Sequence, residues 1–200
     1  MSSATRRLVI ASNNPGKLRE FAALLTPLGI DAVAQSELRI GEADEPHATF
    51  IENALAKARH ASAAAGLPAL ADDSGICVPA LGGAPGVYSA RYAGEPKSDQ
   101  RNNEKLVGAL RDLPRAAFYY CALVLVRSAD DPRPIVADGA WHGEIVDTPR
   151  GDGGFGYDPY FWLPSHQRTA AELPAEEKNR ISHRGLALAA LIQRLRDEPL

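Results

Sequence analysis

The N-terminal part of the chain alternates short apolar runs with a segment of helical periodicity, and this alternation restricts the fold more than any other feature. Residues 8–11 and 30–34 are short, largely apolar runs, which favour strands. Between them, turn-forming residues 12–16 precede apolar side chains at helical spacing, and Gly29 ends the predicted helix. Strands that alternate with helices are typical of α/β proteins, so we predict an α/β fold.

The clearest helix signal in the chain follows. Thr49 and Glu52 fit a capping box at the start of a segment that is rich in alanine. The pattern continues through Ala65, and Gly66 follows as a C-terminal stop. We therefore predict a helix that begins after Thr49 and ends before Gly66.

The rest of the chain adds further strands and helices. In chain order we expect extended pieces at residues 68–71 and 76–78, a helix over 98–110, a strand over 117–126, antiparallel strands over 134–140 and 141–146, a strand at 160–163, and a terminal helix that includes residues 186–195. The antiparallel strands make the predicted sheet mixed. We expect one domain over residues 1–200, with a mixed central β-sheet flanked by helices.

The charge balance excludes a broad surface for nucleic acid. Twenty-two Lys and Arg against 25 Asp and Glu give a net charge of -3. A polyanionic ligand therefore has to be bound by a local cluster of positively charged side chains. The apolar run after Arg6 and Arg7 is too short for a signal peptide, and no stretch reaches the ~20 apolar residues of a membrane helix. Cys77 and Cys121 lie in separate apolar segments, which favours buried free thiols. We expect a cytoplasmic protein without nucleic-acid or membrane partners.

The turn before the first helix is a candidate phosphate site. Its residues are Ser12, Asn13, Asn14, Pro15, Gly16 and Lys17. Backbone N–H groups in such a turn, the positive end of the helix and an ammonium group together favour a phosphate. The segment is not a Walker A sequence, so an ordinary strand-to-helix turn is the alternative.

Two pairs of adjacent acidic residues are candidates for metal chemistry. Asp72 and Asp73 follow an apolar stretch, where carboxylates commonly hold Mg²⁺ or take a proton from water. The alternative is a surface turn with two solvated acids. If the two residues extend a strand, they point to opposite faces and need not share a role. Asp44 and Glu45 lie in a Gly- and Pro-containing stretch, which on its own favours a solvated loop.

A glycine-rich loop at residues 151–156 is the third candidate. Its glycines let the backbone approach a ligand closely, Phe155 and Tyr157 could stack on a base, and Asp158 could accept a hydrogen bond from it. The alternative is a hairpin tip whose aromatic residues pack into the core. A fourth cluster, dense in hydrogen-bond donors near the last helix, contains Lys178, His183 and Arg184.

These segments, in this order, resemble the inosine triphosphate pyrophosphatase family from Leu8 to about Leu195. The matching blocks are Ser12-x-Asn14-x-x-Lys17, Thr49-Phe50-x-Glu52-Asn53-Ala54, Ala71-Asp72-Asp73-Ser74-Gly75, Leu81-Gly82-Gly83-Ala84-Pro85-Gly86-Val87-Tyr88-Ser89-Ala90-Arg91, Gly153-Gly154-Phe155-Gly156-Tyr157-Asp158-Pro159, and Glu177-Lys178 with Ser182-His183-Arg184. So many blocks in sequence make the resemblance specific. It implies an α/β fold with two lobes around a substrate cleft, and a homodimer.

The resemblance also implies an activity. The family hydrolyses noncanonical purine nucleoside triphosphates (ITP, dITP and XTP) to the monophosphate and pyrophosphate with Mg²⁺, which removes them from the nucleotide pool before incorporation into DNA or RNA. By matching position, Asp73 is the implied base and a Mg²⁺ ligand, and Glu45 is a second ligand. The implied substrate contacts are residues 12–17, Ser74, Phe155, Gly156, Tyr157, Asp158, Lys178, His183 and Arg184.

One position departs from the family pattern. The family usually has Gly two residues after the second metal ligand, whereas this chain has Pro46 and His47 after Glu45. Since Pro fixes φ and His adds bulk, the choice between Asp44 and Glu45 as the second metal ligand stays open.

Base discrimination follows from hydrogen bonding. Hypoxanthine and xanthine present a 6-oxo acceptor where adenine presents an amino donor, so donors such as His183 or Arg184 aimed at O6 would reject adenine. The sequence identifies no residue that rejects guanine.

Two other functions remain open at this point. One is a phosphohydrolase that forms an aspartyl-phosphate at Asp72 or Asp73. The other is a nucleotide-sensing or RNA-binding module, and the near-neutral net charge disfavours RNA binding.

Overall fold

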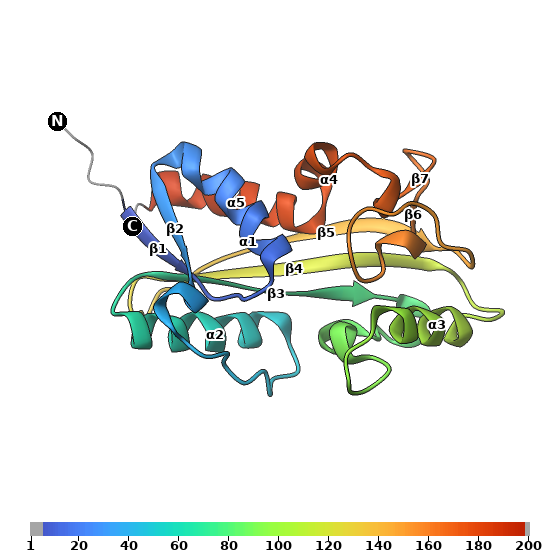
Figure 1. Ribbon diagram of the computed structural model, residues 1–200, viewed down its shortest axis with the longest axis horizontal. Helices are drawn as coiled ribbons and strands as arrows, with labels where there is room; N and C mark the ends of the chain where they lie inside the picture. Colours follow the sequence, from blue (N-terminus) through green and yellow to red (C-terminus); the bar gives the residue numbers. More distant parts are fainter. Residues whose placement is uncertain (1–5, 199–200) are drawn as a thin grey trace. The chain divides into compact units, whose positions relative to one another are not determined.

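The computed structural model describes residues 6–198, except for the side chain of Leu24 (Figure 1). The described residues fall into two compact units. The first contains the N-terminal segment up to Asp73, Ala122–Asp138 and the C-terminal segment from Ala187, and the second contains Ser74–Cys121 and Gly139–Leu186. The single domain expected over residues 1–200 stays a prediction.

The described strands form one mixed sheet in the order β2-β1-β3-β4-β5-β6-β7. They are β1 Arg6–Ile10, β2 Ile30–Ala34, β3 Ala69–Cys77, β4 Ala116–Val126, β5 Ile135–Ile145, β6 Phe161–Leu163 and β7 Arg168–Thr169. β1 pairs in parallel with β2 and β3, whereas β6 pairs antiparallel with β5 and β7. The predicted α/β fold with a mixed sheet flanked by helices is confirmed.

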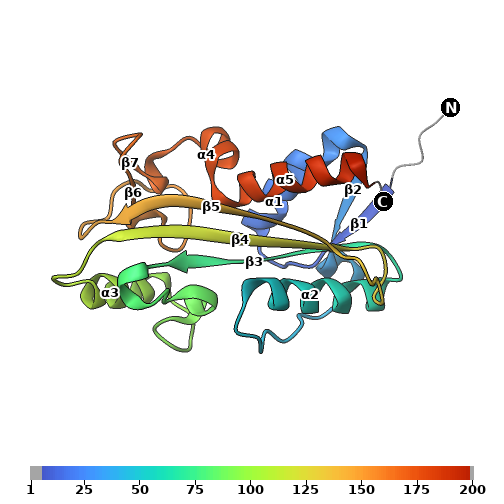
Figure 2. The same ribbon diagram turned by 180° about the vertical axis from the view of Figure 1, so that it is seen from behind.

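In the first unit, α1 (Pro15–Leu25) and α2 (Phe50–Ala65) cover opposite faces of the sheet (Figures 1 and 2). α2 begins where the sequence predicts, because Oγ1 of Thr49 accepts a hydrogen bond from the backbone N–H of Glu52. It ends at Gly66, whose φ of 65° lies in the left-handed region that favours glycine.

The face of α2 that packs on the sheet carries small side chains. Ala54, Ala58 and Ala61 are fully buried and belong to one core cluster with Val9 of β1 and Ala69 of β3. Methyl groups fill little space, so the helix lies close to the strands. The polar side chains of Asn53 and Lys57 on this helix thereby reach Asp73 in β3.

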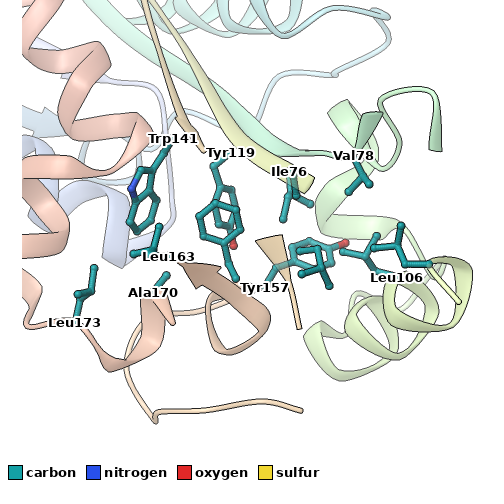
Figure 3. Close-up of a cluster of buried hydrophobic side chains, with 13 residues drawn as sticks. Ile76, Val78, Leu106, Tyr119, Trp141, Tyr157, Leu163, Ala170 and Leu173 are labelled. Atoms are coloured by element: carbon teal, nitrogen blue, oxygen red, sulfur yellow. The ribbon is translucent and has the colours of Figure 1, made fainter. Parts of the chain in front are cut away.

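In the second unit, α3 (Asp99–Ala109) and α4 (Ala175–Ile181) also lie on opposite faces of the sheet (Figures 1 and 2). The core of this unit is the apolar cluster drawn in Figure 3, in which the ring of Tyr119 lies 6.3 Å from that of Trp141 and 4.8 Å from that of Phe161. The terminal helix α5 (His183–Asp197) begins in this unit and continues into the first.

β3 is one continuous strand, which corrects the prediction of two extended pieces separated by residues 72–75. These residues continue the strand, and Asp72 and Asp73 are both buried. Ionised carboxylates are seldom buried without partners, and no partner is visible in the local sequence. In the fold, other elements supply them, among them Lys17 and Asn53.

β5 is likewise one strand, rather than the two predicted over residues 134–140 and 141–146. Its glycines do not make turns. A Cβ at Gly143 would overlap the backbone of Trp162 in β6, so glycine allows the two strands to approach closely. The short elements α4 and β7 were not predicted from the sequence.

The thiols and the lengths of the helices bear on two further expectations. Cys77 and Cys121 are buried and form no disulfide, as predicted, and burial raises the pKa of the Cys77 thiol to about 11. None of the helices between residues 6 and 198 has both the length and the apolar character needed to cross a membrane.

Candidate functional site

The predicted phosphate turn caps α1. Oδ1 of Asn14 accepts hydrogen bonds from the backbone N–H groups of Gly16 at 2.9 Å and Lys17 at 3.2 Å. The backbone N–H of Asn14 in turn donates to Oγ of Ser12. Pro15 is the first helical residue, where its missing N–H is not needed. Two N–H groups that the sequence assigned to a phosphate are therefore held by the Asn14 side chain.

Other side chains of the turn reach neighbouring segments. Nδ2 of Asn13 donates to Oε1 of Glu42 at 3.1 Å. Nζ of Lys17 lies 2.8 Å from Oδ2 of Asp72, and the Asp72 side chain is only 1% exposed. A pair this well buried fixes the ammonium strongly. Asp72 therefore positions Lys17 beside the turn.

Asp73 lies one strand position further on and meets different partners. Its Oδ2 accepts a hydrogen bond from Nδ2 of Asn53 at 3.2 Å, and its Oδ1 lies 3.7 Å from Nζ of Lys57. The same Nζ donates to Oε1 of Glu45 at 2.5 Å. Asn53 and Lys57 are four residues apart on α2 and therefore share one face of the helix.

The loop that carries Glu45 is fixed through its backbone. Oδ1 of Asn53 accepts the N–H of His47 at 3.0 Å, and Nδ2 of Asn53 donates to the His47 carbonyl at 3.2 Å. These bonds need no glycine at position 47, so the departure from the family pattern is accommodated. Glu45 is half-buried beside Lys57, whereas Asp44 is exposed.

The charges of this cluster depend on one another. Burial raises the pKa of Asp73, and the nearby Glu45 adds to the effect, while Lys57, Asn53 and Lys17 oppose it only in part. For Lys57, burial alone would lower the pKa, but Asp72, Asp73 and Glu45 outweigh it and raise the pKa. The cluster thus combines a carboxylate of increased basicity with an ammonium that stays protonated.

The residues present fit a magnesium ion. Mg²⁺ usually takes one or two protein carboxylates and completes its shell with water and substrate phosphate oxygens. Among residues 6–198, no three His, Cys, Asp or Glu side chains gather as a cation site. Glu45 and Asp73 do converge on one positive group, the ammonium of Lys57. Two hard oxygen ligands directed at one cation suit a site that a phosphate completes.

In the second unit, the buried carboxylate of Asp158 accepts three hydrogen bonds. Its Oδ2 accepts from the backbone N–H of Phe155 at 2.9 Å and from Nζ of Lys178 at 2.5 Å, and its Oδ1 accepts from the hydroxyl of Tyr119 at 3.2 Å. Gly154 has a φ of 74°, and a Cβ there would overlap this carboxylate. Phe155 is 42% exposed, and the Lys178 ammonium lies 5.1 Å from the centre of its ring.

The neighbouring loop residues are anchored to the protein itself. The N–H of Gly156 donates to Oδ2 of Asp99, and its carbonyl accepts from Nδ2 of Asn103, both at 2.9 Å. Tyr157 belongs to the core cluster, and its hydroxyl donates to the Ser89 carbonyl at 2.8 Å. The first turns of α3 and the 3₁₀ helix Gly86–Arg91, which contains Ser89, therefore hold the glycine-rich segment in place.

The start of α5 brings two more predicted residues into this unit. His183 is buried, and its ring stacks on that of Tyr119 with centroids 4.7 Å apart and planes 10° apart. Arg184 is also buried, and its Nη2 donates to Oγ of Ser74 at 3.2 Å. Ser74 directly follows Asp73 in β3, so the residue that Arg184 contacts is the sequence neighbour of Asp73.

The predicted residues thus gather within each unit. The first unit brings together residues 12–17, Asp72, Asp73 and Glu45, and the second joins Ser74 to Arg184 and Phe155 to Asp158 and Lys178. His183 joins the second group through Tyr119.

Five residues of these clusters were missed by sequence reasoning: Asn53, Lys57, Asp99, Asn103 and Tyr119. Asn53 and Lys57 had a signal, because they lie four residues apart on an otherwise alanine-rich helix that follows an acidic loop. Tyr119 had none, since an aromatic residue in a central strand ordinarily indicates core packing.

Comparison with known proteins gives a consistent result. The model of the Ham1 family matches residues 8–194. The dITP/XTP pyrophosphatase of Ralstonia nicotianae is 68% identical over 195 residues, which are 96% of this chain and 97% of that protein. The dITP/XTP pyrophosphatase of Nitrosomonas europaea is 66% identical and covers 94% of each chain.

Solved structures extend the similarity to the fold. A HAM1 protein from Coxiella burnetii superposes with a TM-score of 0.91 at 48% identity, covering 96% of this chain and 99% of that one. A nucleoside-triphosphatase, or dITP/XTP pyrophosphatase, from Mycobacterium abscessus has a TM-score of 0.71 at 39% identity, with coverages of 97% and 98%.

Proposed function

The chain belongs to the Ham1 family, and from this premise we propose that it hydrolyses noncanonical purine nucleoside triphosphates such as dITP, XTP and ITP to the monophosphate and pyrophosphate. Relatives named for dITP and XTP match almost its whole length. The structural observation that carries the proposal is the buried carboxylate of Asp73, held by Asn53 and Lys57 and made more basic by burial.

Asp73 is the proposed general base. Its raised pKa brings it closer to the range in which a carboxylate accepts a proton efficiently. It takes a proton from a water molecule whose oxygen forms a bond to the α-phosphorus. The bond from the α-phosphorus to the oxygen that bridges to the β-phosphorus breaks, and pyrophosphate leaves with that oxygen. Asn53 orients the carboxylate through its hydrogen bond to Oδ2.

We propose Asp73 and Glu45 as the residues that would hold Mg²⁺. When bound, the ion would neutralise phosphate charge and polarise the phosphoryl group. Lys57 keeps the two carboxylates directed at one place, because its ammonium contacts both. Chelation of divalent ions with EDTA is expected to abolish turnover, and restoration by Mg²⁺ is the control. Full activity in EDTA would contradict the metal requirement.

Residues 12–17, which form the turn and the first residues of α1, are the proposed triphosphate site. Lys17 supplies a positive charge that Asp72 holds in position. Binding of a phosphate at this helix start would compete with Oδ1 of Asn14 for the N–H groups of Gly16 and Lys17. Ser12 and Asn13 complete the proposed contacts from the same turn.

The second unit is the proposed site of base recognition. Phe155 offers an exposed ring for stacking, and Lys178, His183 and Arg184 supply donors suited to a 6-oxo purine. A donor aimed at O6 would face the amino group of adenine and leave both groups unpaired, which can give discrimination of ~10⁴-fold. Ser74, bonded to Arg184, is a further proposed contact.

Hydrolysis in ¹⁸O-labelled water tests the proposal. Purified protein with Mg²⁺ is given dITP, XTP or ATP, and pyrophosphate, orthophosphate and the label in the monophosphate are measured. We expect pyrophosphate and labelled monophosphate from dITP and XTP, and little product from ATP. Release of orthophosphate would contradict the proposal and favour an aspartyl-phosphate mechanism at Asp72 or Asp73. Binding without turnover would favour a nucleotide sensor.

We further propose that the protein acts as a cytoplasmic homodimer. The support for the dimer is membership of the family, which the sequence resemblance associates with a homodimer. The support for the location is the proposed activity, because an enzyme that clears a nucleotide pool has to be in the same compartment as its substrates. Light scattering after size-exclusion chromatography tests the dimer, with a mass near twice 21.4 kDa as the expected result. Fractionation of the source cells tests the location.

A further inference from the structure

One buried side chain contacts two of the groups proposed to recognise the base. Tyr119 lies in β4 and is 8% exposed. Its hydroxyl donates to Oδ1 of Asp158, and its ring stacks on His183. Sequence reasoning assigned no function to Tyr119, and the proposed mechanism does not use it.

The hydroxyl determines how Asp158 is held. Oδ2 of Asp158 carries the ammonium of Lys178 and the N–H of Phe155, so the orientation of this carboxylate sets where both are placed. The Tyr119 hydroxyl occupies the other oxygen and prevents the carboxylate from turning. Burial and the neighbouring Asp158 raise the pKa of Tyr119 well above its usual value, so the hydroxyl stays protonated and remains a donor.

The ring determines how His183 is held. The two planes differ by only 10°, with centroids 4.7 Å apart, so the imidazole lies flat on the phenol. Tyr119 itself is kept in place by Phe161, whose ring meets it edge-on with centroids 4.8 Å apart. The ring of Trp141 lies 6.3 Å from that of Tyr119, and Figure 3 shows these two labelled rings near each other. The core of the unit thus fixes one ring, and that ring fixes the imidazole.

We propose that Tyr119 is a specificity-positioning residue, which sets the orientation of Asp158 with its hydroxyl and of His183 with its ring so that the oxo-purine edge is recognised. The inference rests on the proposed function. Tyr119 is a positioning residue that acts through these two groups, because its other side-chain contacts are with the aromatic core of its own unit.

Two variants separate the two contacts. Tyr119→Phe removes the hydroxyl and keeps the ring, whereas Tyr119→Leu removes both. Tyr120→Phe is the matched control, because it deletes a tyrosine hydroxyl from the adjacent strand position, which points to the opposite face. For each protein, kcat and KM are measured with dITP and with dATP, together with the unfolding midpoint in urea.

For Tyr119→Phe we expect KM for dITP to rise by about three- to tenfold, with kcat within about twofold of wild type. The ratio of kcat/KM for dITP to that for dATP should fall by a similar factor, and further in Tyr119→Leu. Tyr120→Phe should keep the wild-type ratio. A purely structural role would lower the unfolding midpoint and leave this ratio unchanged.

The outcomes that contradict the inference differ from those that contradict the proposed function. If wild type releases pyrophosphate from dITP and Tyr119→Phe keeps the wild-type KM and ratio, the role of Tyr119 is wrong and the function stands. If wild type does not hydrolyse dITP or XTP, the proposed function and this inference both fail. Should Tyr119→Leu not fold, Tyr119→Phe alone decides.

Discussion

Nζ of Lys17 lies 2.8 Å from Oδ2 of Asp72, and this pair joins the first turn of α1 to the middle of β3. The Lys17 side chain is 18% exposed, so the ion pair is largely withdrawn from water. Removing one member of a buried pair leaves the other charge poorly compensated, whereas removing both is far less costly. The pair therefore couples the stability of the protein to the placement of the proposed triphosphate ligand.

Lys17→Met is expected to lower the free energy of unfolding by about 3 kcal/mol, because Asp72 loses the ammonium in a buried place. The double variant Lys17→Met with Asp72→Asn should recover most of that loss without recovering activity. Urea unfolding and dITP turnover measure the two effects. Lys97→Met, at an exposed lysine, is the control and should change stability by less than about 0.5 kcal/mol. Recovery of activity in the double variant would contradict the proposed role of Lys17.

Asp73→Asn should abolish turnover while the fold and nucleotide binding persist, because the shape is kept and only the base and its charge are lost. We expect kcat to fall by about 10³-fold or more. Asp138→Asn, which alters an exposed strand carboxylate, is the matched control and should retain wild-type kcat. A near wild-type rate in Asp73→Asn would remove Asp73 from the mechanism.

The raised pKa of Asp73 predicts a pH dependence of stability. A carboxyl group whose pKa is higher in the folded state binds its proton more tightly there, so ionisation costs stability as pH rises. We expect the unfolding free energy of wild type, relative to Asp73→Asn, to decrease in EDTA as the pH rises above about 4, the ordinary pKa of an aspartate. Urea titrations of both proteins at increasing pH measure it. A difference that is constant or increases with pH would show that the pKa is not raised.

His183→Ala and Arg184→Ala are each expected to narrow the gap in kcat/KM between ITP and ATP, since each removes a donor proposed to face O6. Arg194→Ala removes an exposed arginine from the same helix and serves as the control. Side-by-side turnover of ITP, XTP, GTP and ATP gives the comparison. An unchanged ITP to ATP ratio in both variants would mean that the base is read elsewhere.

Replacement of glycine by alanine is expected to have opposite effects on stability at two helical positions. A Cβ at Gly185 would overlap the carbonyl of Asn179, so Gly185→Ala should destabilise the protein by about 2 kcal/mol or more and disturb the start of α5. At Gly108 of α3 nothing lies within 4 Å of a Cβ, so Gly108→Ala should stabilise by up to about 1 kcal/mol. Urea unfolding compares them. Equal effects at both positions would contradict the overlap at Gly185.

The elements that could be predicted from sequence are those whose signals are local. Thr49 and Gly66 determine the ends of α2 through their own chemistry, and the apolar run of β2 coincides with the observed strand. β3 was not predicted as one strand, because Asp72 and Asp73 are stabilised there by Lys17, Asn53 and Lys57 from distant segments. Burial of charge depends on partners that local pattern does not reveal.

The same distinction applies to the site. Asp73 and Lys178 were named because matching motifs contain them, and Glu45 was named by its matching position. Lys57 was not named, since one lysine in an alanine-rich helix is ordinarily a solvated side chain. Its contacts with Glu45 and Asp73 arise only when the loop before α2 folds back and β3 lies beneath the helix. Tyr119 likewise gains its contacts with Asp158 and His183 only in the folded protein.

The size of the side chains on the alanine face of α2 affects the proposed reaction as well as the packing of the core. Ala54, Ala58 and Ala61 set the spacing between helix and strands, and Asn53 and Lys57 ride on that helix. A single added methylene in this layer would push the helix away from the strands. The amide of Asn53 and the ammonium of Lys57 would then move away from Asp73. Larger side chains at these three buried positions are therefore expected to lower turnover as well as stability.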